Sequence, residues 1–475
     1  MLQQTAISNF ESAVKGNLPF TPNAQQTIAI TKICKFIFNK YERSIFILKG
    51  YAGTGKTNLI SAFTKALPTV KWRSVLLAPT GRAAKVLGNY SGLTANTIHK
   101  KIFKKQTGAD GIVYFSLAQN MHRNTLFIVD EASMISADSG GSQQVFNNLL
   151  ENLFEYVYSG VNCKLILIGD TAQLPPVGSN DSPALNPNYL KSTFHLNIFL
   201  FELTEVARQR LESGILLNAT NLRNNLTNAI FSLPKLICTP DVVQLNGEEL
   251  EDTINSAVSN FGEENVIIIT RSNKRANLFN QNFRNRIKYF DEDLCAGDNL
   301  MIVKNNYFWL PETNGEAGFI ANGDMAQITK IIKRETIYDF NFCECVLSFI
   351  DYPNLPEQYV KIITDCLCTD SPALTTEDQK KLYNNVLADA SNEPSKALRM
   401  HFVKNSPYYN ALQVKFSYAI TCHKSQGGQW PIVFIDQGYL SDENVDEGFI
   451  RWLYTALTRA TEKVYLVNFN NVFFK

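Results

Sequence analysis

The sequence lacks three features that would place it in a specialised class of protein. No apolar run in its 475 residues approaches the length that crosses a membrane. Residues 1–20 lack the basic and apolar segments of a secretory signal. The formal net charge is only +1, so no overall basic field indicates nucleic acid as a partner. We therefore expect a soluble intracellular protein in which any nucleic-acid surface is local.

The sequence also lacks the cysteine spacing of a disulfide-rich or zinc-binding protein. Its nine cysteines are odd in number and scattered, which favours reduced thiols. The pairs Cys343/Cys345 and Cys366/Cys368 are C-x-C, whereas structural zinc sites use C-x₂₋₄-C. From Cys343 to Phe349 the apolar period is two, as on the buried face of a strand. A strand is the favoured interpretation, with zinc as the alternative.

The strongest motif present is a phosphate-binding loop (P-loop) between an apolar strand and a helical pattern. The motif G-x-x-x-x-G-K-[ST] is met by Gly50, Gly55, Lys56 and Thr57, with Gly53 inside the loop. Glycines let several backbone N–H groups converge on one anion, and the helix N-terminus adds partial positive charge. Lys56 then reaches the β- and γ-phosphates, and the Thr57 hydroxyl ligates Mg²⁺. The sequence therefore predicts binding of a nucleoside triphosphate.

Two further apolar strands end in polar residues that would complete a hydrolytic site. In Asp130-Glu131 the first acid would complete the Mg²⁺ shell through water, and the second would deprotonate the attacking water. Asp170 ends the next strand, and the uncharged Gln173 after it can sense the γ-phosphate. Arg208 is a candidate second cation for the phosphates. Ligands of open α/β sheets gather at such strand ends.

Two more positions are expected to border the nucleotide. Gln25 and Gln26 stand at the start of a helical stretch upstream of the P-loop, where a glutamine amide suits the edge of adenine. Which of the two faces adenine stays open, although the spacing to Ala29 favours Gln26. Near the C-terminus, Arg459 follows a helix that would border the cleft. An arginine there can stabilise charge on the transferring phosphoryl group.

A second group of polar residues follows other strand ends and predicts contacts with phosphates or sugars. These residues are Pro79, Thr80, Thr97, His99, Thr421, His423, Lys424 and Gln426. Thr80 has two interpretations, as an ordinary helix cap or as a ligand of a nucleic-acid phosphate. A lone histidine such as His423 is usually a polar residue whose hydrogen bonds are made within the protein. The other polar residues on the same loop, however, favour a binding surface.

Residues 100–124 predict a β-hairpin inserted in the first domain. Two short strands flank the turn-rich hexapeptide 106–111. Four lysines together with Phe103, Tyr114 and Phe115 combine attraction for phosphates with a stacking or wedging surface. The alternative is an ordinary charged hairpin.

The order of apolar segments predicts two α/β units. Strands alternate with helices to about residue 205, and the pattern restarts at Val266–Thr270. From about 300 to 410 short alternating strands suggest a small antiparallel barrel-like insertion. The expected domains are a first lobe at 1–99 and 125–204, a hairpin insertion at 100–124, a second lobe at 205–304 and 410–475, and the insertion at 305–409.

Taken in order, these motifs resemble those of the superfamily 1 helicases, in particular the RecD/Dda-like group. The resemblance is carried by Gln26, Gly50–Thr57, residues 78–80 and 97–99, Asp130-Glu131, Gly169-Asp170 with Gln173, Arg208, residues 421–427 and Thr458-Arg459. It spans nearly the whole chain and implies two RecA-like parallel-sheet lobes, with ATP and Mg²⁺ in the cleft between them. Single-stranded DNA would lie across both lobes.

The same resemblance implies further properties. The hairpin would match the strand-separating pin of the family, and residues 305–409 would match its SH3-like accessory domain. We accordingly expect 5′→3′ movement on single-stranded and forked DNA by a monomer, with a single-strand-binding or replication protein as a partner. The expected location is the cytoplasm of a prokaryotic cell or of a phage-infected host.

Two other functions remain open from the residues. One is a nucleic-acid-stimulated ATPase that remodels protein–DNA complexes without unwinding. The other is a nucleotide-dependent binding module without turnover. Because Asp130-Glu131 and Arg459 are both present, the sequence favours turnover.

Overall fold

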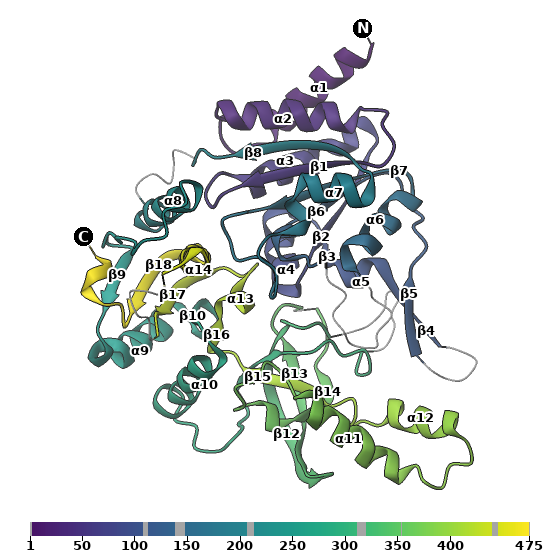
Figure 1. Cartoon of the computed structure of the whole chain (residues 1–475), viewed down its shortest axis with the longest axis vertical. Coiled ribbons are helices and arrows are strands. Elements are labelled where there is room, and N and C mark those ends of the chain that lie inside the picture. The colour runs from purple at the N-terminus through teal and green to yellow at the C-terminus, as the bar shows by residue number, and fades with distance from the viewer. Residues whose placement is uncertain are drawn as a thin grey trace.

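The computed structural model describes residues 2–107, 113–137, 148–206, 213–310, 320–352, 354–438 and 445–474. They form two α/β lobes, a closed β-barrel and a two-stranded hairpin (Figure 1). This arrangement confirms the predicted fold class, with the hairpin in the first lobe and the small barrel in the second. None of the helices described is long and apolar enough to cross a membrane.

The first lobe contains a six-stranded sheet in the order β3-β2-β6-β7-β1-β8, and every pairing in it is parallel. Its strands are β1 (Ser44–Gly50), β2 (Arg73–Ala78), β3 (Ala95–Thr97), β6 (Arg123–Val129), β7 (Val161–Gly169) and β8 (Asn197–Leu203). Its helices are α1 (Leu2–Gly16), α2 (Ala24–Ile37), α3 (Lys56–Ala66), α4 (Gly81–Ser91), α5 (Ile98–Ile102), α6 (Leu149–Ser159) and α7 (Pro187–Phe194). Because β7 lies between β6 and β1, the ends of these three strands are neighbours.

Helices cover both faces of this sheet, which explains its continuous apolar strands. In β1, Ile45 and Ile47 pack with α5, α6 and α7 on one face. Phe46 and Leu48 pack with α1, α2, α3 and α4 on the other. A strand buried on both faces loses the apolar–polar alternation of a half-exposed strand. The apolar runs that predicted buried strands are thereby accounted for.

The predicted hairpin consists of β4 (Phe103–Thr107) and β5 (Val113–Leu117), which pair antiparallel. It follows α5 directly, and its base is tied to that helix by the N–H of Ala118, which donates to the carbonyl of Ile102 over 2.7 Å. In Figure 1 the two strands project away from the sheet of the first lobe.

The second lobe contains a parallel five-stranded sheet in the order β16-β10-β17-β18-β9. Its strands are β9 (Val242–Leu245), β10 (Val266–Thr270), β16 (Ala419–Thr421), β17 (Trp430–Asp436) and β18 (Ala460–Val467). Its helices are α8 (Gly214–Thr227), α9 (Leu250–Phe261), α10 (Asn273–Asn282), α13 (Cys422–Ser425) and α14 (Glu447–Leu457). Side chains of α8 and α14 cover one face of the sheet, and those of α9 and α10 cover the other.

The barrel is closed by five strands, of which β11 and β15 both lie wholly outside the expected range 305–409. The barrel segment comprises β11 (Asn299–Ile302), β12 (Met325–Ile337), β13 (Phe340–Phe349), β14 (Gln358–Ile363), α11 (Thr376–Asp389), α12 (Lys396–Asn405) and β15 (Leu412–Phe416). Cys343 and Cys345 are buried on one face of β13, as the strand interpretation predicts.

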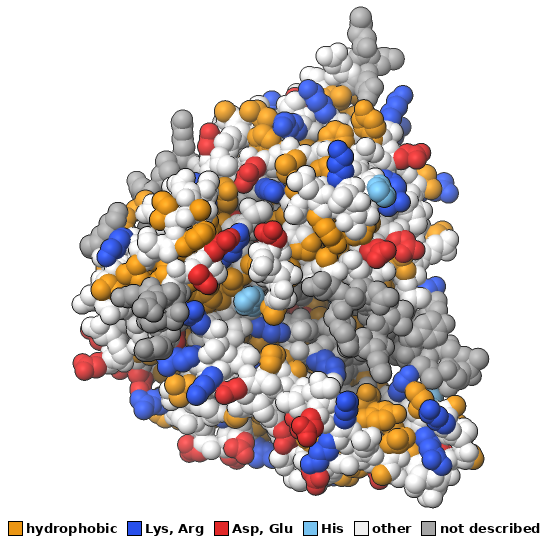
Figure 2. Space-filling model, in the orientation of Figure 1, with side chains coloured by type: hydrophobic (Ala, Val, Ile, Leu, Met, Phe, Trp, Pro, Cys, Tyr) orange, Lys and Arg blue, Asp and Glu red, His pale blue; other side chains and the backbone are white. Residues whose placement is uncertain are grey.

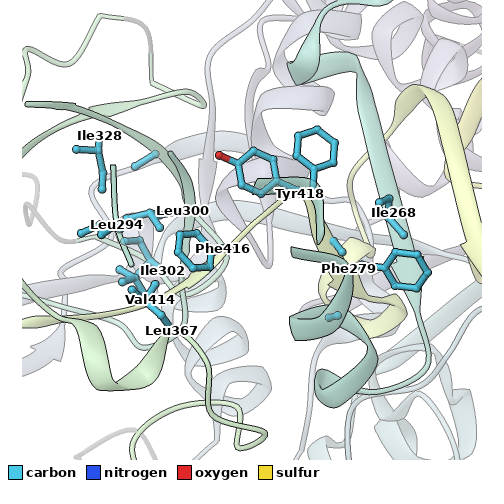
Figure 3. Packing of buried hydrophobic residues seen from close by; sticks show 14 of the residues in the cluster. Ile268, Phe279, Leu294, Leu300, Ile302, Ile328, Leu367, Val414, Phe416 and Tyr418 are labelled. Atoms are coloured by element: carbon cyan, nitrogen blue, oxygen red, sulfur yellow. The ribbon is translucent and has the colours of Figure 1, made fainter. Parts of the chain in front are cut away.

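One hydrophobic core joins the barrel to the second lobe. Ile328 and Leu300 of the barrel belong to the same cluster as Ile268 and Phe279 of the lobe (Figure 3). Tyr418 lies between the two groups and stacks on Phe283 at 4.4 Å between ring centroids. The barrel and the second lobe therefore share a packed hydrophobic core and are not connected by a linker alone.

Candidate active site between the two lobes

The P-loop connects β1 to α3 with the backbone geometry that its glycines permit. Gly53 and Gly55 have φ values of 77° and 85°, a region that favours glycine. A Cβ added at Gly50 would lie 3.1 Å from the side chain of Lys56. Lys56 Nζ donates to the carbonyls of Gly50 and Tyr51 over 2.5 and 2.9 Å. The lysine thus lies over the loop whose N–H groups would receive a phosphate.

The two adjacent glutamines have different partners. Gln26 is buried, its Nε2 donates to the carbonyl of Thr54 in the P-loop over 3.0 Å, and its Oε1 accepts from the N–H of Asn23. Gln25 Oε1 instead accepts from the N–H of Thr204, at the end of β8. Gln26 is therefore the glutamine that lies against the P-loop.

The two acids after β6 are partly buried, and only 21% of the Glu131 side chain is exposed. Asp130 Oδ1 accepts from the N–H of Glu131 over 2.9 Å, and Glu131 has a φ of 52°. Burial raises the pKa of both carboxyl groups. The rise is opposed at Asp130 by the N–H of Glu131 and then by Lys56, and at Glu131 chiefly by Arg459. A raised pKa makes Glu131 a better proton acceptor near neutral pH.

The Thr57 hydroxyl, on the second residue of α3, and the Asp130 carboxylate supply oxygen ligands. Mg²⁺ prefers such hard oxygen donors and is usually held by one or two protein groups together with phosphates and water. Asp130 directly follows β6, which lies next but one to β1 in the sheet, so these residues fit a Mg²⁺–triphosphate complex.

The loop after β7 is held by the second lobe. Asp170 is buried, and its Oδ2 accepts from the hydroxyl of Tyr454 over 2.5 Å. The N–H of Leu174 donates to Thr455 Oγ1 over 2.9 Å. Gln173 is buried between these contacts, and its Oε1 has no hydrogen-bond partner among the residues that the structure describes. This oxygen is available to a ligand or a water molecule.

Arg459 brings a cation from the second lobe to the acids of the first. It follows α14, is buried, and donates to the carbonyls of Thr455 and Gly428 over 3.1 and 3.3 Å. Its Nη1 lies 3.8 Å from Glu131 Oε1. The charges of Arg459 and Lys56 both lower the pKa of Glu131, so the two cations approach the same carboxylate from different lobes.

Comparisons with known proteins identify relatives of this chain. Residues 21–233 match a family model described as an AAA domain, and residues 416–467 match the UvrD-like helicase C-terminal domain. The ATP-dependent DNA helicase Dda of phage T4 is 27% identical over 61% of this chain and 62% of its own length. The ATP-dependent RecD2 DNA helicase of Deinococcus radiodurans is 31% identical over 38% of this chain and 21% of its own length.

This chain belongs to the superfamily 1 helicases, in the RecD/Dda-like group. An uncharacterised protein of Acanthamoeba polyphaga mimivirus is 25% identical over 93% of the helicase and 99% of its own length. A solved structure of Pif1 helicase from Bacteroides, in complex with ADP-AlF3 and ssDNA, is 15% identical in sequence, with a TM-score of 0.47. The alignment covers 95% of this chain and 93% of the Pif1 chain.

The loops predicted to contact nucleic acid meet where the two lobes and the barrel adjoin. Thr80 caps α4, and a Cβ added at Gly427 of the other lobe would lie 2.6 Å from the Cβ of Ala83. His423 is exposed, and Lys424 Nζ donates to Asn322 Oδ1 of the barrel over 2.5 Å. Pro79 and Thr421 are partly exposed beside them. Both signs of charge are spread over the face shown in Figure 2.

Three of the predicted nucleic-acid contacts have buried side chains, and their roles stay predictions. Thr97 caps α5 through a bond from the N–H of Lys100. Phe103 is 6% exposed and belongs to the core of the first lobe. Gln426 is 4% exposed and its Nε2 donates to the carbonyl of Leu174 over 2.7 Å, so it joins the lobes. His99 is partly buried, and burial lowers its pKa to about 4, so it is uncharged at neutral pH.

Some predicted residues lie outside what the structure describes. Arg208 and the hairpin turn at 108–112 are outside the described residues, and so are the side chains of Tyr114 and Phe115. Their proposed contacts with phosphates and bases stay predictions.

A contact between the barrel and the first lobe was not predicted from the sequence. Asp351 Oδ1 lies 3.3 Å from Arg82 Nη1 and 3.5 Å from Lys85 Nζ, both on α4. Tyr352 donates to Asp324 Oδ1 over 3.1 Å, and both side chains abut Gly81. The barrel thus closes over the helix that Thr80 caps. These partners are far apart along the chain, and no local pattern marks them.

Proposed function

We propose that this helicase hydrolyses ATP between its lobes to move 5′→3′ along single-stranded DNA and to separate duplex strands at a fork. The observation that carries the proposal is the approach of Arg459, from the second lobe, to Glu131 beside Lys56 in the first. The family resemblance supports the polarity. It also supports a cytoplasmic monomer, in a prokaryotic cell or phage-infected host, that works with a single-strand-binding or replication protein.

The hydrolytic step follows from the groups around the crevice. On ATP binding, Lys56 exchanges the carbonyls of Gly50 and Tyr51 for phosphate oxygens. Mg²⁺, held by Thr57 and through water by Asp130, would neutralise phosphate charge. Glu131 takes a proton from the attacking water, and Arg459 stabilises charge on the transferring phosphoryl group.

Hydrolysis is coupled to movement because the γ-phosphate carries the negative charge that attracts cations from both lobes. Loss of the γ-phosphate removes the anion that attracts Lys56 and Arg459 toward one another, and the lobes relax apart. Residues at the two lobes' DNA-facing ends, Thr80 on one and His423 on the other, then hold the strand in alternation. Each hydrolysis step thereby becomes a displacement along DNA.

Strand displacement on forked substrates tests the proposal. Forked DNA and RNA duplexes carrying either a 5′ or a 3′ tail are mixed with protein and ATP, and the released strand is measured. We expect release from DNA with a 5′ tail and little from DNA with a 3′ tail. Release that requires the 3′ tail would contradict the polarity. ATP hydrolysis without release from any fork would favour a remodelling ATPase.

Shortening the hairpin tests strand separation apart from translocation. Replacing residues 107–113 by a two-residue Asn-Gly turn joins the paired residues Gln106 and Tyr114, so the remaining β4–β5 pairs keep their register and the buried Phe103 stays in place. We expect unwinding to fall at least about tenfold, a barrier increase of about 1.4 kcal/mol. DNA-stimulated ATPase should stay within about twofold, because the replaced residues include none of the P-loop or of the acids after β6. Undiminished unwinding would exclude the hairpin as a separating pin.

A further inference from the structure

One face of α14 lies against the first lobe. Arg451, Tyr454 and Thr455 are spaced by three and four residues, so they share a helix face, and Arg459 follows directly after the helix end. Arg451 Nη1 donates to the carbonyls of Thr171 and Gln173 in the loop after β7. Thr455 accepts from the N–H of the next residue along that loop. The helix that leads to Arg459 is therefore hydrogen-bonded to this loop at both Arg451 and Thr455.

Tyr454 extends these contacts to the P-loop itself. Its hydroxyl accepts from the N–H of Ala52 over 3.0 Å and donates to Asp170 Oδ2 over 2.5 Å. The Tyr454 ring is almost fully buried in the core of the second lobe. Burial, together with the charge of Asp170, raises the pKa of the phenol well above its ordinary value. The hydroxyl therefore stays protonated and remains a donor to Asp170.

Ala52 directly follows the two P-loop residues that hold the Lys56 side chain. The two preceding carbonyls, of Gly50 and Tyr51, hold Lys56 in the structure. Once Lys56 turns to the phosphates, these carbonyls lose their cation, and the backbone that carries Ala52 adjusts. A group bonded to Ala52 from the other lobe senses that adjustment directly.

We propose that the Tyr454 hydroxyl is a positioning group for hydrolysis, which fixes the end of α14, and hence Arg459, relative to the P-loop at Ala52 and to Asp170. This inference rests on the proposed function, because it assigns a purpose to Tyr454 only if Arg459 acts on the phosphoryl group. Tyr454 itself acts through Arg459 and is not a catalytic residue. Its hydroxyl makes the placement of Arg459 depend on the state of the P-loop.

The test is Tyr454→Phe, which keeps the buried ring and removes only the hydroxyl. With saturating single-stranded DNA we expect kcat for ATP to fall about tenfold or more, while KM for ATP changes less than about threefold, because ground-state binding by the P-loop is kept. The matched control is Tyr465→Phe, on β18 of the same lobe, where Tyr465 stacks on Phe434 at 4.7 Å between centroids. The control should retain wild-type kcat.

A double-mutant cycle with Arg459→Ala separates positioning from a structural role. If Tyr454 acts through Arg459, Tyr454→Phe should lower the residual single-turnover rate of the Arg459→Ala protein less than about twofold. Full additivity, or an unchanged kcat in Tyr454→Phe, would overturn the inference. Thermal unfolding shows whether each variant is folded. Asp170→Asn weakens the acceptor of the Tyr454 hydrogen bond and is a second variant for which we expect the same result in a double-mutant cycle with Arg459→Ala. A wild-type protein without DNA-stimulated ATPase would instead refute the proposed function.

Discussion

Replacing Arg459 by alanine is expected to lower kcat for DNA-stimulated ATP hydrolysis by about 10³-fold or more, the range measured for arginine fingers. Arg459 is the charge that the second lobe brings to the hydrolytic acids, at 3.8 Å from Glu131 Oε1. KM for ATP should change far less, because Gly53, Gly55 and Lys56 belong to the first lobe. Steady-state ATPase at saturating single-stranded DNA measures both parameters.

The control for this variant is Arg286→Ala, in the same lobe. Arg286 forms an exposed ion pair with Glu251, of the kind that contributes little to stability, so its removal should leave kcat unchanged. Arg459→Lys should recover only part of the activity, because an ammonium group cannot reproduce the planar guanidinium fork. An Arg459→Ala protein with more than about half of the wild-type kcat would remove the second lobe from the chemistry.

Replacing Glu131 by glutamine is expected to lower kcat by about 10²- to 10⁴-fold, as for loss of a general base. Glutamine keeps the size of the side chain and the left-handed backbone at residue 131 but cannot accept the proton of the attacking water. Removing a negative charge beside the phosphates should also leave ATP affinity equal or higher. Single-turnover hydrolysis gives the rate, and equilibrium binding of a fluorescent ATP analogue gives the affinity.

Glu151→Gln is the matched control, since Glu151 is exposed in the first turn of α6. It should hydrolyse ATP at the wild-type rate. Normal hydrolysis by Glu131→Gln would mean that another group activates the water, and Glu131 would then be only a partner of Arg459.

The nucleotide side of the site could be predicted because its geometry is local or follows from parallel strands. The P-loop is one continuous segment whose glycines, lysine and threonine carry their own conformational signal. Asp130, Asp170 and the P-loop end neighbouring parallel strands, so their convergence follows once those strands are recognised. Arg459 was predicted from its place after a helix of the second α/β unit.

The strand-contacting side was harder to predict because each residue's partner is distant in sequence. Gln426 and Leu174 belong to different lobes, and nothing near Gln426 indicates that its amide will be buried. Phe103 looks like a hairpin aromatic, yet it packs with the helices that cover the first sheet. The contact of Asp351 with α4 depends on how the barrel docks, which local periodicity does not encode.

Tyr454 belongs to a polar pattern on α14 that is visible in the sequence. Polar groups recur at one face of the otherwise apolar α14, from Arg451 to Thr455, and lead directly to Arg459. A buried apolar helix keeps polar groups on one face only where they find partners. That spacing indicated an inter-lobe surface, although only the structure identifies the partners as Ala52 and Asp170.

The most direct measurement is the rate of ATP hydrolysis by the wild-type and Lys56→Ala proteins, each with and without a single-stranded oligonucleotide. If the triphosphate is bound and hydrolysed between the two lobes, we expect the oligonucleotide to accelerate ATP hydrolysis by the wild-type enzyme. We expect Lys56→Ala to stay at the background rate in both conditions. DNA-accelerated hydrolysis at the wild-type rate by Lys56→Ala would contradict it.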